Sequence, residues 1–168
     1  MEDRQTVHDA FVRGDLTALR ATCGDPLVFP NTAPPPGFGE HVLQYAIYHS
    51  ALAFIRELLE CGADPAYRPL DGFPAVIAAL ASARADRFAV VELLLDHGAD
   101  VEQRGINDWT PLHYAAAAND VAAIELLCAR GADATARTRV DDRATPREEA
   151  EILGRAEAVR ALRMVERR

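Results

Sequence analysis

The sequence predicts an all-α fold in which repeated helix-turn-helix units stack as a solenoid, and three observations predict it. The tripeptide Gly-Ala-Asp occurs at residues 62–64, 98–100 and 131–133, with its glycines 36 and then 33 residues apart. A fixed period of this length is typical of stacked supersecondary units. Each tripeptide follows a run whose apolar residues recur on one helix face, and its glycine suits the left-handed conformation that ends a helix.

Two helix starts are also written in the sequence. The Thr-Pro pair at 110–111 places an N-cap before a first helical position that needs no N–H. The pair at 145–146 repeats this start, and Glu148 completes a capping box. Residues 111–131 leave room for two short helices, with a break before Asp120, which is expected to cap the second.

These features together resemble the ankyrin repeat. The resemblance rests on the Thr-Pro-Leu-His-x-Ala start at residues 110–115, the x-Leu-Leu-x-x-Gly-Ala-Asp ending and the period near 33. It implies an ankyrin-repeat solenoid of helix-turn-helix units joined by β-hairpin-like loops. About three full repeats are expected, with degenerate capping repeats at both ends, in a single domain over residues 1–168.

The expected units differ in how closely they match the repeat. Residues 105–137 match it closely, whereas the unit 70–102 has Phe-Pro-Ala-Val where the motif has Thr-Pro-Leu-His, and the unit 37–68 has His-Val-Leu-Gln there. Residues 1–26 are interpreted as a degenerate first repeat and residues 142–168 as a C-terminal cap. Atypical ends are expected, because each unit of a stack buries its apolar face only against its neighbours.

Two segments depart from the pattern. Four extra residues fall around 80–85, in good helix-forming sequence, so we expect a longer first helix with a displaced turn in the unit 70–102. The proline-rich segment 26–39 is expected to be an extended loop. Its apolar residues are expected to lie against the stack: Leu27, Val28, Phe29 and Phe38. The sequence leaves open whether either segment has a function.

Charge narrows the class of partner. The formal net charge is −8, and all 18 basic residues are arginine. Phosphate binding needs a positive field, so nucleic acid and anionic membranes are not expected as main partners, and a basic protein partner is favoured. The lack of lysine excludes lysine Schiff-base and P-loop chemistry. Combined with abundant alanine and arginine, it also favours a GC-rich bacterial genome.

Three further features of the sequence indicate the cellular compartment of the protein. No apolar run approaches the roughly 18 residues of a membrane span, and the N-terminus is acidic without the apolar stretch of a secretory signal. The three cysteines are isolated and form no C-x-x-C pair, which favours a reducing compartment. We therefore expect a cytoplasmic protein.

The sequence offers no catalytic set. Its five histidines lack the spacing with glutamate or cysteine of a zinc site, and neither G-x-S-x-G nor a glycine-rich phosphate loop occurs. The resemblance implies that His113 forms a hydrogen bond between repeats. Asp64, Asp100 and Asp133 lie one repeat apart and are interpreted as turn-forming residues. We therefore expect no enzyme activity, no cofactor and no metal.

The resemblance implies a binding surface instead, because partners usually bind the concave groove between hairpin tips and first helices. Trp109, the single tryptophan, falls at a normally exposed position of this face, and aromatic and arginine side chains dominate binding hot spots. The alternative, that Trp109 and Tyr114 pack on neighbouring repeats, stays open. By position, the partner-binding residues are Glu40, Tyr45, Arg68, Phe73, Arg104, Ile106, Asn107, Trp109, Tyr114 and Arg139.

Three classes of function compete. The favoured class is a protein-interaction module that binds a partner through the groove without catalysis. Its sharper form is an immunity or inhibitor protein that neutralises a bacterial toxin or enzyme. The second class is an enzyme or small-ligand binder with a site at 26–39 or 80–85, and the third is a self-assembling structural component, although a monomer is expected.

Overall fold

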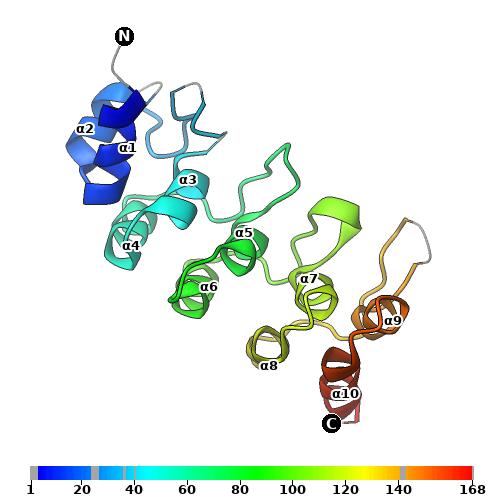
Figure 1. The fold of residues 1–168 in the computed structure, drawn as a ribbon. Helices are drawn as coiled ribbons and strands as arrows, with labels where there is room; N and C mark the ends of the chain where they lie inside the picture. The colour runs from blue at the N-terminus through cyan, green and yellow to red at the C-terminus, as the bar shows by residue number, and fades with distance from the viewer. Residues whose placement is uncertain (1–3, 24–26, 36, 40, 141–142, 168) are drawn as a thin grey trace.

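The computed structural model describes residues 4–23, 27–35, 37–39, 41–140 and 143–167. Within them the chain forms ten α-helices and one short 3-10 helix (Figure 1). In order, these are α1 (Arg4–Arg13), α2 (Leu16–Thr22), α3 (Val42–His49), α4 (Leu52–Glu60), α5 (Ala75–Ala81), α6 (Arg87–Asp96), η1 (Ile106–Asp108), α7 (Pro111–Ala117), α8 (Val121–Ala129), α9 (Pro146–Ile152) and α10 (Ala156–Val165).

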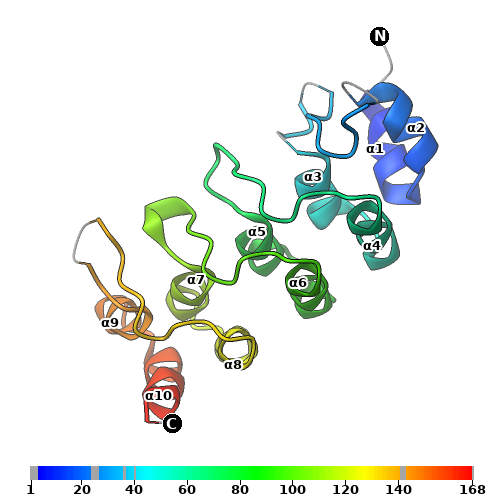
Figure 2. The same ribbon diagram turned by 180° about the vertical axis from the view of Figure 1, so that it is seen from behind.

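The helices follow one another as pairs in a single row, with the two chain ends at opposite ends of the row (Figures 1 and 2). The first helices α3, α5, α7 and α9 lie on the side from which long loops project, and the second helices α4, α6 and α8 lie on the other side. The described residues contain no β-strand, so the chain is an all-α stack joined by hairpin-shaped loops. The repeat boundaries drawn from the sequence stay a prediction.

The second helices end where the glycines predict. Gly62, Gly98 and Gly131 all have φ of 90° to 93°, a region that residues with a Cβ rarely adopt. After the first of these turns, the backbone N–H of Ala63 donates to the carbonyl of Leu58 at 2.9 Å. The chain thereby satisfies a carbonyl that the helix end would leave without a partner.

The first helices α7 and α9 begin as predicted. The Oγ1 of Thr110 accepts from the backbone N–H of His113 at 3.4 Å, and that of Thr145 accepts from Glu148 at 3.2 Å. The Glu148 carboxylate accepts in return from the N–H of Thr145 at 2.9 Å, which completes the predicted capping box. Asp120 caps α8 through the N–H of Ala123, at 3.1 Å.

The extra residues near 80–85 do not lengthen a helix, which corrects one expectation. Helix α5 has seven residues, as many as α7, and the insertion forms the connection from Ser82 to Asp86 instead. Arg84 in this connection donates to the carbonyls of Ile47 and Ser50, at 3.0 and 2.6 Å. The insertion therefore ties α5 and α6 to the end of α3 in the preceding unit.

The segment before α3 is also only partly as expected. Phe29 and Phe38 are buried, but Leu27 is 92% exposed and Val28 is 54% exposed, so these two do not lie against the stack. The first helix pair is well anchored, since Phe11 is completely buried. A continuous core runs from this pair to the last one. No described helix has the length and apolar character needed to span a bilayer.

Candidate partner-binding groove

Three hairpin-shaped loops position the predicted groove beside α5, α7 and α9, and their described residues are 63–74, 99–110, 132–140 and 143–145. Contacts between neighbouring loops hold them in place. The N–H of Ile106 donates to the carbonyl of Gly72 at 2.8 Å, and the amide of Gln103 donates to the carbonyl of Tyr67 at 2.8 Å. Successive loops therefore form one supported surface.

Gly105 is required by this close approach and not by its backbone angle. A Cβ at this position would lie 2.4 Å from the carbonyl oxygen of Gly72, which no side chain tolerates. The next two residues after Ile106 turn the chain sharply, since Asn107 and Asp108 both have φ of 57°. Asn and Asp enter this left-handed region more readily than other residues with a Cβ. The turn directs the Asp108 carboxylate back toward the loops.

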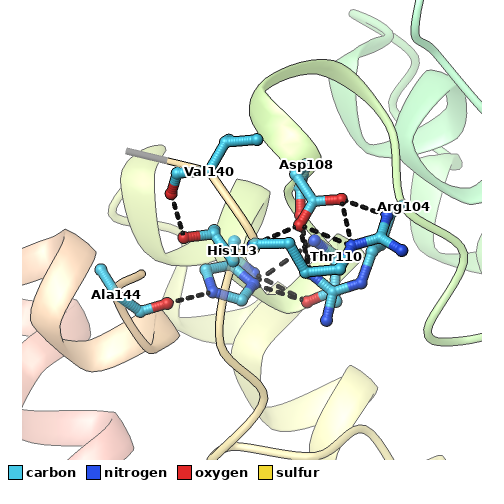
Figure 3. A network of polar contacts seen from close by, with 8 residues as sticks. Arg104, Asp108, Thr110, His113, Val140 and Ala144 are labelled. Atoms are coloured by element: carbon cyan, nitrogen blue, oxygen red, sulfur yellow. Dashed lines mark hydrogen bonds and ion pairs between the residues drawn. The ribbon is translucent and has the colours of Figure 1, made fainter. Parts of the chain in front are cut away.

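Asp108 is the centre of an ionic cluster that spans two hairpins. Its carboxylate accepts from Arg104 Nη1 at 2.8 Å (Figure 3). It also accepts from Nε and Nη2 of Arg139, at 3.0 and 2.5 Å. The backbone N–H of Arg139 adds a further bond, at 2.6 Å. The Arg139 guanidinium, bonded to this carboxylate, holds the pKa of Asp108 below its usual value. Two of the predicted binding arginines therefore share one carboxylate.

His113 lies beneath this cluster and is fully buried. Its Nε2 lies 3.0 Å from the carbonyl oxygen of Ala144 in the next unit (Figure 3). A carbonyl only accepts, so Nε2 carries the hydrogen, and Nδ1 accepts from the Thr110 hydroxyl at 2.8 Å. Burial lowers the pKa of His113, which keeps the ring neutral. The predicted hydrogen bond between repeats is confirmed.

The predicted aromatic residues are half-buried. Tyr45 packs between units, with its ring 4.6 Å from that of Phe11 and its hydroxyl 2.8 Å from Nδ1 of His8. Phe73 and Tyr114 pack partly against the core, and Trp109 is half-buried at the base of its hairpin. Burial raises the pKa of Tyr45 and Tyr114, which keeps both phenols neutral.

The exposed members of the predicted set lie on the hairpins. Arg68, Ile106, Asn107 and Arg139 are exposed, whereas Arg104 is half-buried beside Asp108. Glu40 lies outside the described residues. The sequence reasoning missed the central role of Asp108. A usable signal was present, because Arg104 and Asp108 are four residues apart and Arg139 follows about one repeat later.

Two of the hollows on the described surface lie in the later part of the stack. One, of about 390 Å³, lies between hairpins and is lined in part by Arg68, Arg104 and Arg139. The other, of about 820 Å³, lies between α8 and α10. Among the described residues, no group of three or more histidine, cysteine or acidic side chains is arranged to hold a metal ion.

Comparison with known proteins places the chain in a family. The family model described as ankyrin repeats (3 copies) matches residues 43–138 and again residues 78–164. No curated protein matches the chain. The matched ranges cover more than half of the sequence and reach from within α3 to within α10. This chain belongs to the ankyrin-repeat family.

Proposed function

We propose that this chain binds a partner protein through the concave surface formed by its hairpins and first helices, without catalysis. Ankyrin repeats are in general protein–protein interaction modules and are typically not catalytic. A repeat stack offers an extended concave surface for such binding. The expected cytoplasmic location and bacterial origin stay predictions.

The observation that carries the proposal is the exposure of large aliphatic side chains on the hairpins. Leu70 is 93% exposed, Ile106 is 42% exposed and Val140 is 46% exposed. Single exposed aliphatic residues are common on monomers, but here one occurs on each of three successive hairpins. A protein partner that covers the row would remove all three from water.

The ionisable groups near the surface support binding rather than catalysis. His113 is fully buried and both of its ring nitrogens are engaged in hydrogen bonds, so neither nitrogen is available to exchange a proton with a substrate. The Asp108 carboxylate is taken up by two arginines. General acid–base catalysis needs a group within reach of substrate whose pKa is near the working pH. His113 and Asp108 instead hold neighbouring hairpins and repeats together.

The proposal is tested by capturing binding partners from host lysate and then repeating the binding with the purified candidate. We expect the double variant Leu70→Ala/Ile106→Ala to lose the partner while retaining wild-type helicity. The matched control is Leu153→Ala/Met164→Ala, which removes apolar groups that are 40% and 58% exposed, from the turn after α9 and from α10, outside the hairpins and first helices. The control should bind normally.

Equal binding by both double variants would overturn the groove as the site. Sedimentation of the free chain tests the expected monomer. A concentration-dependent dimer that the hairpin variant abolishes would mean that the row is covered by a second copy. The identity of a captured partner then decides whether the chain acts as an inhibitor of a toxin or enzyme.

A further inference from the structure

Three aliphatic and three cationic side chains recur together along the hairpins. We name them the hairpin ridge; its residues are Arg68, Leu70, Arg104, Ile106, Arg139 and Val140. Each hairpin contributes one aliphatic side chain and one arginine within two residues of it. A binding segment that crosses the hairpins therefore meets the same pair of chemistries at every repeat.

The cations of the ridge are only partly neutralised. Arg104 and Arg139 share the single carboxylate of Asp108. Arg68 is exposed and makes no ion pair with any described residue. All three arginines line the hollow of about 390 Å³ between the hairpins. This hollow has room for a side chain that brings a further negative charge to Arg68.

The acidic groups nearest the ridge are already bonded. Asp100 and Glu102 also line the hollow, but Asp100 accepts from the N–H of Glu102, and Glu102 accepts from that of Asp133, each at 2.8 Å. Asp71, beside Leu70, accepts from Gln44 Nε2 at 2.6 Å and from the N–H of Phe73 at 2.9 Å. Residues 141 and 142, both aspartates, lie outside the described part and follow the last hairpin's Val140. These carboxylates keep their charge, but none of them forms an ion pair with Arg68, so Arg68 is the cation of the ridge that has no carboxylate partner among the described residues.

The spacing of the hairpins selects the conformation of a bound segment. Neighbouring packed helices lie about 8–10 Å apart, so successive hairpins of a stack are offset by about that distance. A polyproline II segment rises about 3.1 Å per residue and has three residues per turn. Every third side chain therefore lies on the same face, and these side chains are about 9 Å apart. A β-strand alternates faces at every residue and lacks this match.

Building on the function proposed above, we infer that the hairpin ridge binds an extended acidic segment of the partner protein. Aliphatic side chains at every third position of the segment contact Leu70, Ile106 and Val140, and a carboxylate between them pairs with Arg68. The net charge of −8 favours a basic partner at long range. Charges beyond about 8 Å are screened at physiological salt, so the local arginines decide the contact.

Dye-labelled peptides test this inference directly. The probe is a peptide of repeated Pro-Leu-Glu triplets, compared by fluorescence anisotropy with Pro-Leu-Gln, Pro-Leu-Lys and Pro-Ser-Glu versions. We expect the glutamate peptide to bind about two- to fivefold more tightly than the glutamine peptide, the range expected for one exposed ion pair. The lysine and serine versions should bind more weakly than both.

Two arginine variants locate the charge effect. Arg68→Gln should remove the preference for glutamate over glutamine. Arg56→Gln removes the same charge from an exposed position on α4, away from the hairpins, and should leave the preference intact. Tighter binding of the lysine peptide, equal effects of the two variants, or no binding of any peptide would each overturn the inference. The proposed function would survive these results if Leu70→Ala/Ile106→Ala still loses the captured partner.

Discussion

The first and last interfaces of the stack are held together by different chemistry. Between α1 and α3, the contact is aromatic: the Phe11 ring lies 4.6 Å from that of Tyr45, which lies 5.0 Å from that of Phe38. Between α7 and α9, a buried hydrogen bond joins His113 to Ala144, and Arg139 pairs with Asp108. The unit with the best match to the repeat uses polar contacts that fix geometry. The first helix pair, α1 and α2, packs on α3 mainly through apolar area, which tolerates a less regular sequence.

The largest effect should come from the aromatic interface. Phe11→Ala removes a fully buried ring and should destabilise the first helix pair by about 4 kcal/mol. Units of a stack contact only their neighbours, so α1 and α2 should unfold before the rest. Urea unfolding followed by circular dichroism should then show an early step of partial helix loss.

The control for this change is Val12→Ala, on the same helix but 49% exposed. It should leave the unfolding curve close to that of the wild type, because little apolar area is lost. If Phe11→Ala unfolds in one step at the wild-type midpoint, the aromatic contact does not hold the first pair.

The polar interface should respond nearly as strongly. His113→Ala leaves the Thr110 hydroxyl and the Ala144 carbonyl buried without their partner and opens a cavity. We expect a loss of about 3 kcal/mol in the free energy of unfolding. Thermal and urea unfolding measure it, and hydrogen exchange should locate the weakened protection in α9 and α10.

Glu125→Ala is the control, at an exposed position of α8 in the same unit as His113. It should change stability by only a few tenths of a kcal/mol. Weakened protection in α1 and α2, rather than in α9 and α10, would contradict the assignment of His113 to the last interface.

In the middle of the stack, the inserted residues provide a third kind of contact between units. At the position of His113 the unit 70–102 has Val76, which cannot hydrogen-bond to its neighbour. Arg84 instead links this unit to the carbonyls of Ile47 and Ser50 and pairs with Asp86, whose pKa it lowers. Arg84→Ala should therefore lower the free energy of unfolding by about 2 kcal/mol.

Arg84→Lys sharpens this test, because a single ammonium cannot reproduce the planar fork that reaches both carbonyls and the carboxylate. We expect little recovery of stability in urea unfolding. Full recovery would mean that a positive charge alone suffices, and that the insertion has no particular geometric role.

Local rules predicted the regular parts of this fold well. A few neighbouring residues determine where a helix begins or ends, so these features can be predicted from the sequence alone. They are the helix ends at Gly62, Gly98 and Gly131 and the caps at Thr110 and Thr145. The insertion could not be read in this way. Its residues favour helix, yet α5 ends at Ala81, because helix propensity is weak beside the stacking that aligns α5 with α3 and α7.

The candidate site was harder to predict than the fold. The positions of Arg68 and Ile106 on a hairpin follow from the repeat period. The pairing of Arg104 and Arg139 with Asp108 depends on how one hairpin lies against the next, which local sequence does not specify. The same holds for Trp109 and Tyr114, whose half-burial depends on contacts between repeats.

The smallest expected effect is the dependence of stability on pH, to which one histidine in each of the two interfaces contributes. Burial lowers the pKa of His113 in the last interface, and burial together with His8 lowers that of His49 in the first. The unfolded chain, with histidine pKa values near 6.5, then binds more protons than the folded chain as pH falls. Stability should be fully present above about pH 6.5 and decline below it. NMR titration of the histidine ring protons should show both residues titrating below the reference value. If His113 titrates at the reference value, its ring is not held neutral by burial, and the polar interface is more open to water than its contacts imply.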